Sequence, residues 1–467
     1  MKFKLNRLMR SVFMAILYST IGAVTVLIIG FIIYLNNQAD LDVWHLAKLD
    51  QEFTVNSGVD NFEDYLALEE RLFRQLDQRV YARTAPGQSS NDIIRYHRGS
   101  LSDPARWPTN WNRSFVLAKK TPRASVLLLH GMSDSPYSLR NLGEHLNDAG
   151  AYVLGLRLPG HGTAPSGLVD ITWQDMAAAV RLAVRHLKQK NGNQPVYVIG
   201  YSNGAALAVN YALETLENEK LPKVKRIVVL SPAIGVTSVA ALAVWQARLG
   251  HLMGLKKLAW NAILPEYDPY KYNSFAVNAG NVVYQLTNEI QEKLLALSEE
   301  NKLGELPPIL AFSSVVDATV STPALVRGLF ERLPQSSHEL VLFDINHKTD
   351  IKPLMKWNPT EVLQALQATP DHNFTLSIVS NHNEQNQKVM VHSQKPEEDE
   401  TNVSELAIQW PPDLYSLAHI ALPFPENDPL YGGNPKGKNP GLRLGNIALR
   451  GERGVLRISG TDMMRLR

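Results

Sequence analysis

One short stretch, Pro195–Gly204 (PVYVIGYSNG), constrains the fold of this chain more than any other. An apolar run rich in β-branched residues leads into Gly-x-Ser-x-Gly, and the small residues that follow are typical of a helix start. A serine in a strained turn needs neighbours without bulky side chains, and Gly200 and Gly204 provide them. The stretch therefore predicts a strand, a sharp turn and a helix, with the Ser202 hydroxyl above the end of a sheet.

Strands and helices alternate on both sides of this turn. Several apolar runs predict strands, and each run ends at a loop or a turn. Amphipathic segments that predict helices lie between the first of these strands. Thr172 and Asp175 have the spacing of a capping box at the start of one helix. The alternation predicts an α/β fold with a mostly parallel sheet and helices on both faces. The further strands are expected in AYVLGLRL, RIVVLSPA, PPILAFSSVVD and HELVLFDIN.

The α/β domain is expected to span residues 121–467 and to carry two insertions. Residues 235–306 interrupt the alternation with apolar, mainly helical sequence, which predicts a lid above the carboxyl ends of the strands; helices that simply extend the fold are the alternative. A C-terminal insertion is expected at about 370–410, with two strands flanked by polar residues in FTLSIVS and KVMVHS. Residues 36–120 form a polar N-terminal extension with one predicted helix, 62–80, that packs on the main domain.

An uncharged apolar run at Val12–Leu35 predicts a transmembrane anchor. About 24 helical residues can cross a hydrocarbon core of about 30 Å. A cleaved signal peptide is the alternative, but it normally has a shorter apolar region and a small-residue cleavage site. Basic residues dominate residues 1–11 and acidic residues follow the run, which predicts a cytoplasmic N-terminus and places the rest of the chain in the periplasm or outside the cell. The basic residues before the run are Lys2, Lys4, Arg7 and Arg10, and the acidic residues after it are Asp40, Asp42 and Asp50.

Composition excludes several functions. The net charge of +2 over 467 residues argues against a nucleic-acid surface. The absence of cysteine excludes disulfides, thiolate metal sites and a cysteine nucleophile. No metal-binding motif and no dinucleotide-binding glycine motif is present, so neither a metal nor a cofactor is expected.

A serine hydroxyl becomes a useful nucleophile when a histidine takes its proton and a carboxylate orients that histidine. Asp317 follows a predicted strand and is the expected carboxylate. Two histidines compete as the base. Spacing favours His347, whereas His419 lies between apolar segments, as a partly buried base should. Sequence reasoning prefers His419 and keeps His347 as the alternative.

An oxyanion hole needs two backbone donors near the nucleophile. The N–H of Asn203 is one candidate, and the N–H of Met132 in the His130-Gly131-Met132 turn is the other. His130 and His161 lie in glycine-rich turns and are expected to structure their loops. Other histidines lie in polar contexts and are expected to be solvated: His338, His372, His382 and His392.

The segments LLLHGMSDSPYSLR, LRLPGHGTAPSGL, VIGYSNGAALA and SVVDATVS together resemble the carboxylesterase and monoacylglycerol-lipase branch of the α/β-hydrolase fold. The resemblance implies Ser202 as nucleophile, Asp317 as acid, and the N–H groups of Met132 and Asn203 as the oxyanion hole. YSLAHIALPF is similar to the histidine turn of such esterases, which implies His419 as base. The chain as a whole is similar to membrane-anchored bacterial hydrolases. It departs from compact esterases in the long stretch between Asp317 and His419.

The expected function is a membrane-anchored serine hydrolase of the carboxylesterase or lipase type. It would cleave small acyl esters, such as lipid-derived esters, through an acyl-enzyme on Ser202. An amidase or aminopeptidase of the same fold is a second hypothesis, with Glu266 and Asp268 as the only nearby acidic residues that could hold a substrate amine. An inactive binding protein on a hydrolase fold is the third.

Overall fold

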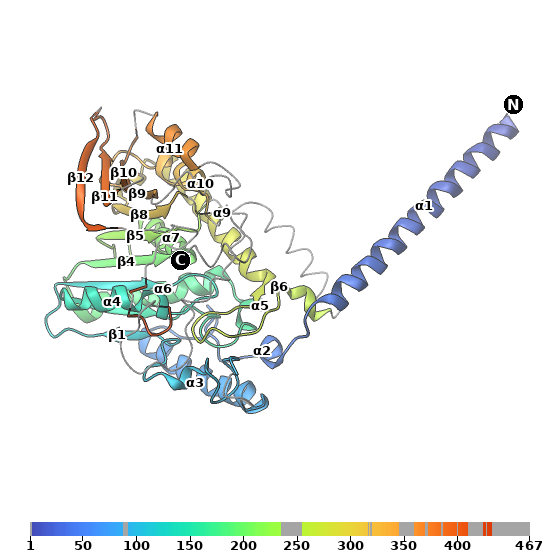
Figure 1. Cartoon of the computed structure of the whole chain (residues 1–467), viewed down its shortest axis with the longest axis horizontal. Coiled ribbons are helices and arrows are strands. Elements are labelled where there is room, and N and C mark those ends of the chain that lie inside the picture. Colours follow the sequence, from blue (N-terminus) through green and yellow to red (C-terminus); the bar gives the residue numbers. More distant parts are fainter. Residues whose placement is uncertain are drawn as a thin grey trace.

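The described residues of the computed structural model form one ten-stranded sheet, in the order β1-β3-β2-β4-β5-β8-β9-β10-β11-β12, with a separate two-stranded sheet of β6 and β7 (Figure 1). Strands β3 to β10 along this order are parallel, β1 is antiparallel to β3, and β11 and β12 continue the sheet as antiparallel strands. The mostly parallel α/β sheet is confirmed. The structure describes residues 2–86, 92–234, 255–315, 317, 320–344, 359–368, 372–383, 386–398, 400–409, 424–425 and 427–431.

The strands are β1 (Phe115–Leu117), β2 (Ala124–Leu129), β3 (Ala151–Leu156), β4 (Val196–Tyr201), β5 (Arg226–Leu230), β6 (Trp260–Ala262), β7 (Phe275–Ala276), β8 (Ile309–Ser314), β9 (Glu339–Asp344), β10 (Thr375–Asn383), β11 (Asn386–Gln394) and β12 (Asn402–Gln409). The α-helices are α1 (Lys2–Asn37), α2 (Val43–Leu46), α3 (Phe62–Arg79), α4 (Tyr137–Asp148), α5 (Gly167–Asp170), α6 (Trp173–Asn191), α7 (Asn203–Glu217), α9 (Val277–Glu299), α10 (Thr322–Gly328) and α11 (Pro359–Gln367).

Strand β2 shows how the sheet is covered on both faces. Its side chains alternate, so Val126 and Leu128 pack in a cluster with Leu139 of α4, whereas Leu127 and Leu129 join the cluster that contains α6 and α7. Strands buried on both faces are expected to be continuously apolar, as β3 and the last four residues of β2 are. The sheet is therefore a middle layer, and its carboxyl edge is fixed in place from both sides.

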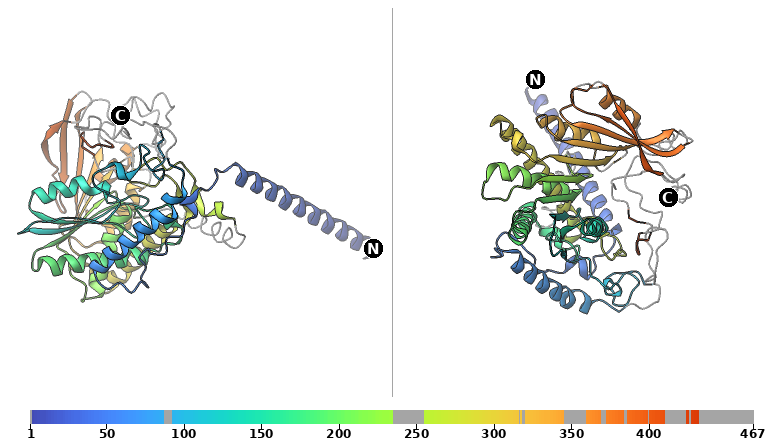
Figure 2. Two further views of the ribbon diagram at one scale, coloured as in Figure 1. Left: turned by 90° about the horizontal axis from the view of Figure 1, so that it is seen from below. Right: turned by 90° about the vertical axis from the view of Figure 1, so that its left-hand side faces the viewer.

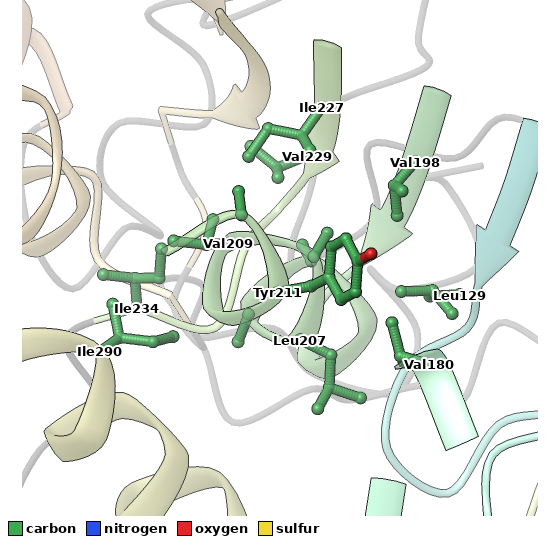
Figure 3. Packing of buried hydrophobic residues seen from close by; sticks show 14 of the residues in the cluster. Leu129, Val180, Val198, Leu207, Val209, Tyr211, Ile227, Val229, Ile234 and Ile290 are labelled. Carbon is green, nitrogen blue, oxygen red and sulfur yellow. The ribbon is translucent and has the colours of Figure 1, made fainter. Parts of the chain in front are cut away.

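Helix α7 lies at the centre of the larger cluster and directly follows the Ser202 turn. Figure 3 shows Leu207, Val209 and Tyr211 of α7 among side chains of the neighbouring strands and helices. Its start is rich in alanine, which lets the helix lie close to β4. Helix α6 packs alongside it, and its predicted capping box is present: Thr172 and Asp175 bond to each other's backbone N–H groups.

The described part of the predicted lid, residues 255–306, contains two different structures. Helix α9 buries Val282, Leu286 and Ile290 in the main cluster and contacts α7, so it is a core helix on the chain path from β5 to β8. The segment before it contains the short hairpin of β6 and β7 and the loop between them. Residues 235–254 of the predicted lid lie outside the described residues.

The N-terminal extension packs on the α/β domain through α3, which confirms the helix predicted at 62–80. Helix α3 contacts α6, and Tyr65 donates to the backbone oxygen of Arg157 after β3 at 2.6 Å. The guanidinium of Arg157 is 1% exposed and pairs with Glu52 at 2.9 Å and Glu69 at 3.0 Å. These contacts join the extension to the loop that follows β3.

Residues 372–409 add strands to the sheet. Strand β10 pairs parallel with β9, and β11 and β12 follow as antiparallel neighbours. The sequence predicts β10 and β11, but not β12, whose residues are all exposed.

Helix α1 leads away from the α/β domain in Figure 1 and in the left view of Figure 2. Among the described residues, no helix is both long enough and apolar enough to cross a membrane. The span expected at residues 12–35 stays a prediction.

Candidate active site

The turn between β4 and α7 has the strained backbone that the sequence predicts. Strand β4 ends at Tyr201, α7 begins at Asn203, and Ser202 between them has φ 53° and ψ −114°. A positive φ is uncommon for a residue with a side chain and persists only where the surroundings impose it. Such outliers cluster at functional sites, so Ser202 is the first candidate catalytic residue of this structure.

Two glycines make this turn possible by allowing backbones to approach. A Cβ atom on Gly200 would lie 2.3 Å from the backbone oxygen of Gly204, and one on Gly204 would lie 2.2 Å from the oxygen of Leu129. Both distances are far below van der Waals contact. The Gly-x-Ser-x-Gly pattern is therefore required here because α7 lies directly against β2 and β4.

Hydrogen bonds hold Ser202 in place. Its backbone N–H donates to the backbone oxygen of Leu230 at the end of β5 (2.9 Å). Its backbone oxygen accepts from the N–H groups of Ala205 (3.1 Å) and Ala233 (3.1 Å). The residue is 8% exposed, whereas Asn203 beside it is fully buried. The turn is thus fixed to the neighbouring strand end and keeps a small accessible surface at the serine.

The His130-Gly131-Met132 turn lies against the same serine. A Cβ atom on Gly131 would lie 3.3 Å from Cβ of Ser202 and 3.1 Å from the ring of Tyr201. Within the described part of the chain, neither the N–H of Met132 nor that of Asn203 has a hydrogen-bond acceptor. Two unused N–H groups beside a serine are the arrangement that an oxyanion hole requires.

His130 and His161 have the structural role expected of them. His130 donates from Nδ1 to the oxygen of Gly131 (2.9 Å) and accepts at Nε2 from the N–H of Leu158 (3.0 Å). Burial lowers the pKa of His130 well below its ordinary value, and burial lowers the pKa of His161 to about 4. Both imidazoles are therefore neutral, and His130 joins the loop after β2 to the loop after β3.

Asp317 follows β8 and is 2% exposed. Its N–H donates to the oxygen of Ser314 (3.0 Å), and its Oδ1 accepts from the N–H of Val320 (2.9 Å). Strand β5 separates β8 from β4 in the sheet. Since neighbouring strands lie about 4.8 Å apart, the strand ends that carry Ser202 and Asp317 are about 10 Å apart on the same edge, which leaves room for an imidazole between them.

The candidate bases His419 and His347 both lie outside the described residues. Two other histidines correct an expectation, because His338 and His372 are not solvated: they are 1% and 9% exposed. Nδ1 of His338 accepts from the N–H of Ile309 (3.1 Å), and Nε2 of His372 donates to the oxygen of Leu366 (2.8 Å). These bonds give both imidazoles structural partners on the sheet and on α11.

Glu266 and Asp268, the candidate amine-binding residues, are fully buried in the loop between β6 and β7. Glu266 accepts from the N–H groups of Asn273 (3.0 Å) and Ser274 (2.8 Å). Asp268 accepts from the N–H groups of Tyr270 (2.9 Å) and Lys271 (3.1 Å). Both carboxylates therefore stabilise the conformation of the loop in which they lie. Among the described residues, no group of three or more histidine, aspartate or glutamate side chains could hold a metal ion.

The sequence analysis missed two aspartates near this site. Asp134 lies in the loop from Gly131 to Pro136, the candidate oxyanion loop, and Asp428 contacts α4, the helix that follows this loop. Burial raises the pKa of Asp134 to about 6, and the nearby ammonium of Lys271 opposes this shift. Asp428 pairs with Arg140 of α4. No spacing in the sequence could have indicated that pair, because its members are far apart in the chain.

Known proteins match the part of the chain that contains this site. Residues 120–345, just under half of the chain, match the family described as serine aminopeptidase, S33. A thermostable monoacylglycerol lipase of Bacillus sp. (strain H-257) is 34% identical over 116 residues, which cover 25% of this chain and 43% of the lipase. The chain thus matches less than half of the length of that relative.

Solved structures also align with the chain. One comes from work on LipS and LipT, two metagenome-derived lipolytic enzymes. It is 21% identical, the alignment covers 50% of this chain and 87% of the other chain, and the TM-score is 0.39. Another is a monoacylglycerol lipase of Paleococcus ferrophilus, 21% identical over 50% of this chain and 88% of its own, with a TM-score of 0.37. The sequence matches therefore show that this part of the chain is similar to α/β-hydrolases of the lipase- and esterase-like serine hydrolase type.

Proposed function

We propose that this protein is a serine esterase that cleaves acyl esters through an acyl-enzyme on Ser202. The observation that carries the proposal is the contact between the Ser202 turn and the Gly131 turn, which brings two unused N–H groups beside one strained serine. Acyl transfer needs this combination, because negative charge develops on the carbonyl oxygen as the hydroxyl attacks.

In the proposed mechanism, Oγ of Ser202 attacks the ester carbonyl while a histidine accepts its proton. The N–H groups of Met132 and Asn203 donate to the oxyanion. The histidine returns the proton to the leaving alcohol. A water molecule then attacks the acyl-enzyme while the histidine accepts its proton, and the histidine passes this proton to Oγ of Ser202 as the acid is released. Asp317 orients the histidine. The Val320 N–H bond on Oδ1 of Asp317 supports this role, because it fixes the carboxylate at the edge where Ser202 lies.

His419 is the proposed base, and His347 is the alternative. The described residues that follow His419 support this choice: Phe424 packs against Tyr137 at the start of α4, directly after the Gly131 loop. Separate His419→Gln and His347→Gln variants test it. We expect ester turnover to fall about 1,000-fold or more in the first and to remain within about threefold of wild type in the second. The reverse result would assign the base to His347.

A fluorophosphonate probe tests the nucleophile. We expect covalent labelling of the wild type, no labelling of Ser202→Ala, and normal labelling of Ser231→Ala, a second buried serine with positive φ at the end of β5. Labelling that survives in Ser202→Ala would refute the proposal.

Peptides and acylated amines are the alternative class of substrate to be tested, because the matching family is described as serine aminopeptidase. The buried, backbone-bonded carboxylates of Glu266 and Asp268 do not favour recognition of a substrate amine. Lipid-derived esters fit the lipase relative better. Turnover of p-nitrophenyl esters should exceed that of aminoacyl p-nitroanilides by at least about 100-fold, and equal turnover would favour the aminopeptidase.

We also propose that α1 anchors the protein in the inner membrane, with the catalytic domain in the periplasm. Large apolar side chains along α1 are exposed, among them Phe13 (64%), Val26 (69%) and Ile33 (54%). Lys257 bonds to the segment after α1, at Oδ1 of Asp40 (2.9 Å) and the oxygen of Gln38 (3.0 Å). This contact would keep the short helical turn Lys256–Ala259, directly before β6, close to the membrane surface.

The absence of cysteine allows a direct test of this topology. Single-cysteine variants Lys4→Cys and Thr54→Cys are treated in intact spheroplasts with a membrane-impermeant maleimide. We expect the second variant to be labelled and the first to be labelled only after lysis. Extraction of the protein by alkaline carbonate, or labelling of both variants before lysis, would contradict the anchor.

A further inference from the structure

The described C-terminal residues, Phe424–Pro425 and Asn427–Tyr431, dock on the α/β domain beside the candidate oxyanion loop; they are called the C-terminal clamp below. Asp428 is 1% exposed and Leu430 is fully buried. Leu430 lies in an aromatic cluster with Trp107, Tyr137 and Tyr270. The clamp is thus an integral part of the packing and not a loose tail.

Asp428 makes the central contacts of the clamp. Its carboxylate accepts from the hydroxyl of Tyr137 (2.9 Å) and pairs with the guanidinium of Arg140, both in the first turn of α4. The same carboxylate accepts from the N–H groups of Leu430 (2.9 Å) and Tyr431 (2.8 Å), which fixes the turn of the clamp. Arg140 in turn lies 4.3 Å from the ring centre of Tyr137.

Tyr431 ties the clamp to a second element, the loop between β6 and β7. Its hydroxyl donates to Oδ2 of Asp268 at 2.5 Å. The rings of Tyr137 and Tyr270 stack at 4.2 Å and 7°, so the start of α4 and this loop are also joined directly. The clamp, α4 and the loop therefore form one connected structure.

This structure holds both ends of the loop from Gly131 to Pro136. At one end, the N–H of Tyr272 donates to the oxygen of Ser133 at 2.7 Å. Ser133 has φ 61° and directly follows Met132. At the other end, Tyr137 begins α4. The direction of the Met132 N–H thus depends on a loop that is bonded on one side to Tyr272, in the same loop as Asp268, and that ends on the other side at Tyr137, which the clamp contacts directly.

We infer that Asp428 and Arg140 are positioning residues for acyl transfer: their ion pair holds the Met132 loop in the conformation that presents its N–H to the oxyanion. This inference rests on the proposed function. Buried ion pairs contribute little net stability compared with apolar groups of similar shape, because desolvation opposes their attraction. A pair of this kind is therefore expected to matter more for geometry than for stability.

Asp428→Asn in the full-length protein tests the inference. The variant keeps the size of the side chain and removes its charge. Since a misplaced oxyanion donor affects the transition state and not substrate binding, we expect kcat to fall about 10- to 100-fold with KM within about threefold of wild type. The rate of fluorophosphonate labelling of Ser202 should fall by a similar factor.

A double variant separates positioning from stability. Asp428→Leu with Arg140→Leu leaves no unpaired buried charge, so we expect Tm to lie near that of wild type while kcat stays low. Glu214→Gln is the matched control: it removes an ion pair with Arg181 on α6, on the face of the sheet opposite α4, and should leave kcat unchanged.

Two results would overturn the inference: an unchanged kcat in folded Asp428→Asn, or recovery of both Tm and kcat in the double variant, which would make the pair merely structural. Failure of the proposed function is distinguishable from either, because it would appear as a wild type that the probe does not label at Ser202.

Discussion

Gly131 lies so close to Ser202 that a methyl group on this glycine would come within 3.3 Å of the serine Cβ atom. The two residues follow neighbouring parallel strands, β2 and β4, which end at the same edge of the sheet. Each strand supplies one part of the candidate site, the nucleophile from β4 and the Met132 N–H from β2. The contact therefore sets the separation between the proposed attacking oxygen and one of the two proposed oxyanion donors.

Replacing Gly131 with alanine should impair catalysis more than folding. The added methyl group would lie 3.1 Å from the Tyr201 ring, so the neighbours must move by a few tenths of an ångström. We expect kcat to fall about tenfold or more and the free energy of unfolding to fall by about 1 kcal/mol. Turnover of a p-nitrophenyl ester and urea denaturation measure the two effects. Gly304→Ala, where no atom lies within 4 Å, is the control, and equal losses of kcat in both variants would contradict the prediction.

Gly204→Ala should instead destabilise the fold. Its Cβ atom would meet the backbone oxygens of Leu129 at 2.2 Å and His130 at 2.5 Å, and backbone cannot rotate away as a side chain can. We expect a loss of about 3 kcal/mol or more in the free energy of unfolding. Gly280→Ala in α9 is a matched helical control with open space around it, and it should stabilise the protein by up to about 1 kcal/mol. A Tm for Gly204→Ala equal to that of wild type would show that α7 can move away from β2.

The sequence predicts those parts of the fold that depend on neighbouring residues. The strained turn at Ser202 follows from Gly200 and Gly204, and the start of α6 follows from the capping box of Thr172 and Asp175. Both signals lie within a few residues, so tertiary structure has little opportunity to override them.

Long-range contacts explain what the sequence does not predict. Strand β12 has no clear alternation because all its residues are exposed, and pairing with β11 is what makes it a strand. His338 lies in a polar segment but is buried, since it directly precedes β9, which pairs with β8 on one side and with β10 on the other. Helix α9 has the apolar composition expected of a lid, and only its contact with α7 shows that it is a core helix.

Adjacent glutamates on α3 should differ in their contribution to stability. Glu69 is 4% exposed in its side chain and bonds to Arg157 (3.0 Å) and the N–H of Ser114 (3.0 Å), whereas Glu70 is half exposed. Glu69→Gln leaves part of the buried guanidinium charge unpaired, so we expect the free energy of unfolding to fall by about 2–4 kcal/mol. Glu70→Gln should change it by less than about 1 kcal/mol. Urea denaturation of the two variants measures the difference, and equal losses would show that Arg157 is compensated by Glu52 alone.

His338 should contribute to acid denaturation. Burial, with a smaller effect from the positive charge of Arg226, lowers its pKa from 6.5 to about 4. Above pH 6.5 the imidazole is neutral in both the folded and the unfolded chain. Between pH 6.5 and about 4 the unfolded chain binds a proton that the folded chain does not, so the free energy of unfolding falls as the pH falls. The loss from this group reaches about 3 kcal/mol at the low end of the window.

His338→Asn tests this contribution, because asparagine Oδ1 can take the place of Nδ1 as acceptor for the N–H of Ile309. The variant does not titrate, so its stability should fall less steeply than that of wild type between pH 6.5 and 4. Other buried histidines, including His45 and His161 with pKa values lowered to about 4, keep part of the slope in both proteins. A measurement at pH 8, where His338 is neutral in both the folded and the unfolded chain, gives the packing effect of the substitution alone. The same pH slope in both proteins would mean that His338 is protonated in the fold, and that its ring is less completely desolvated than its burial at the start of β9 implies.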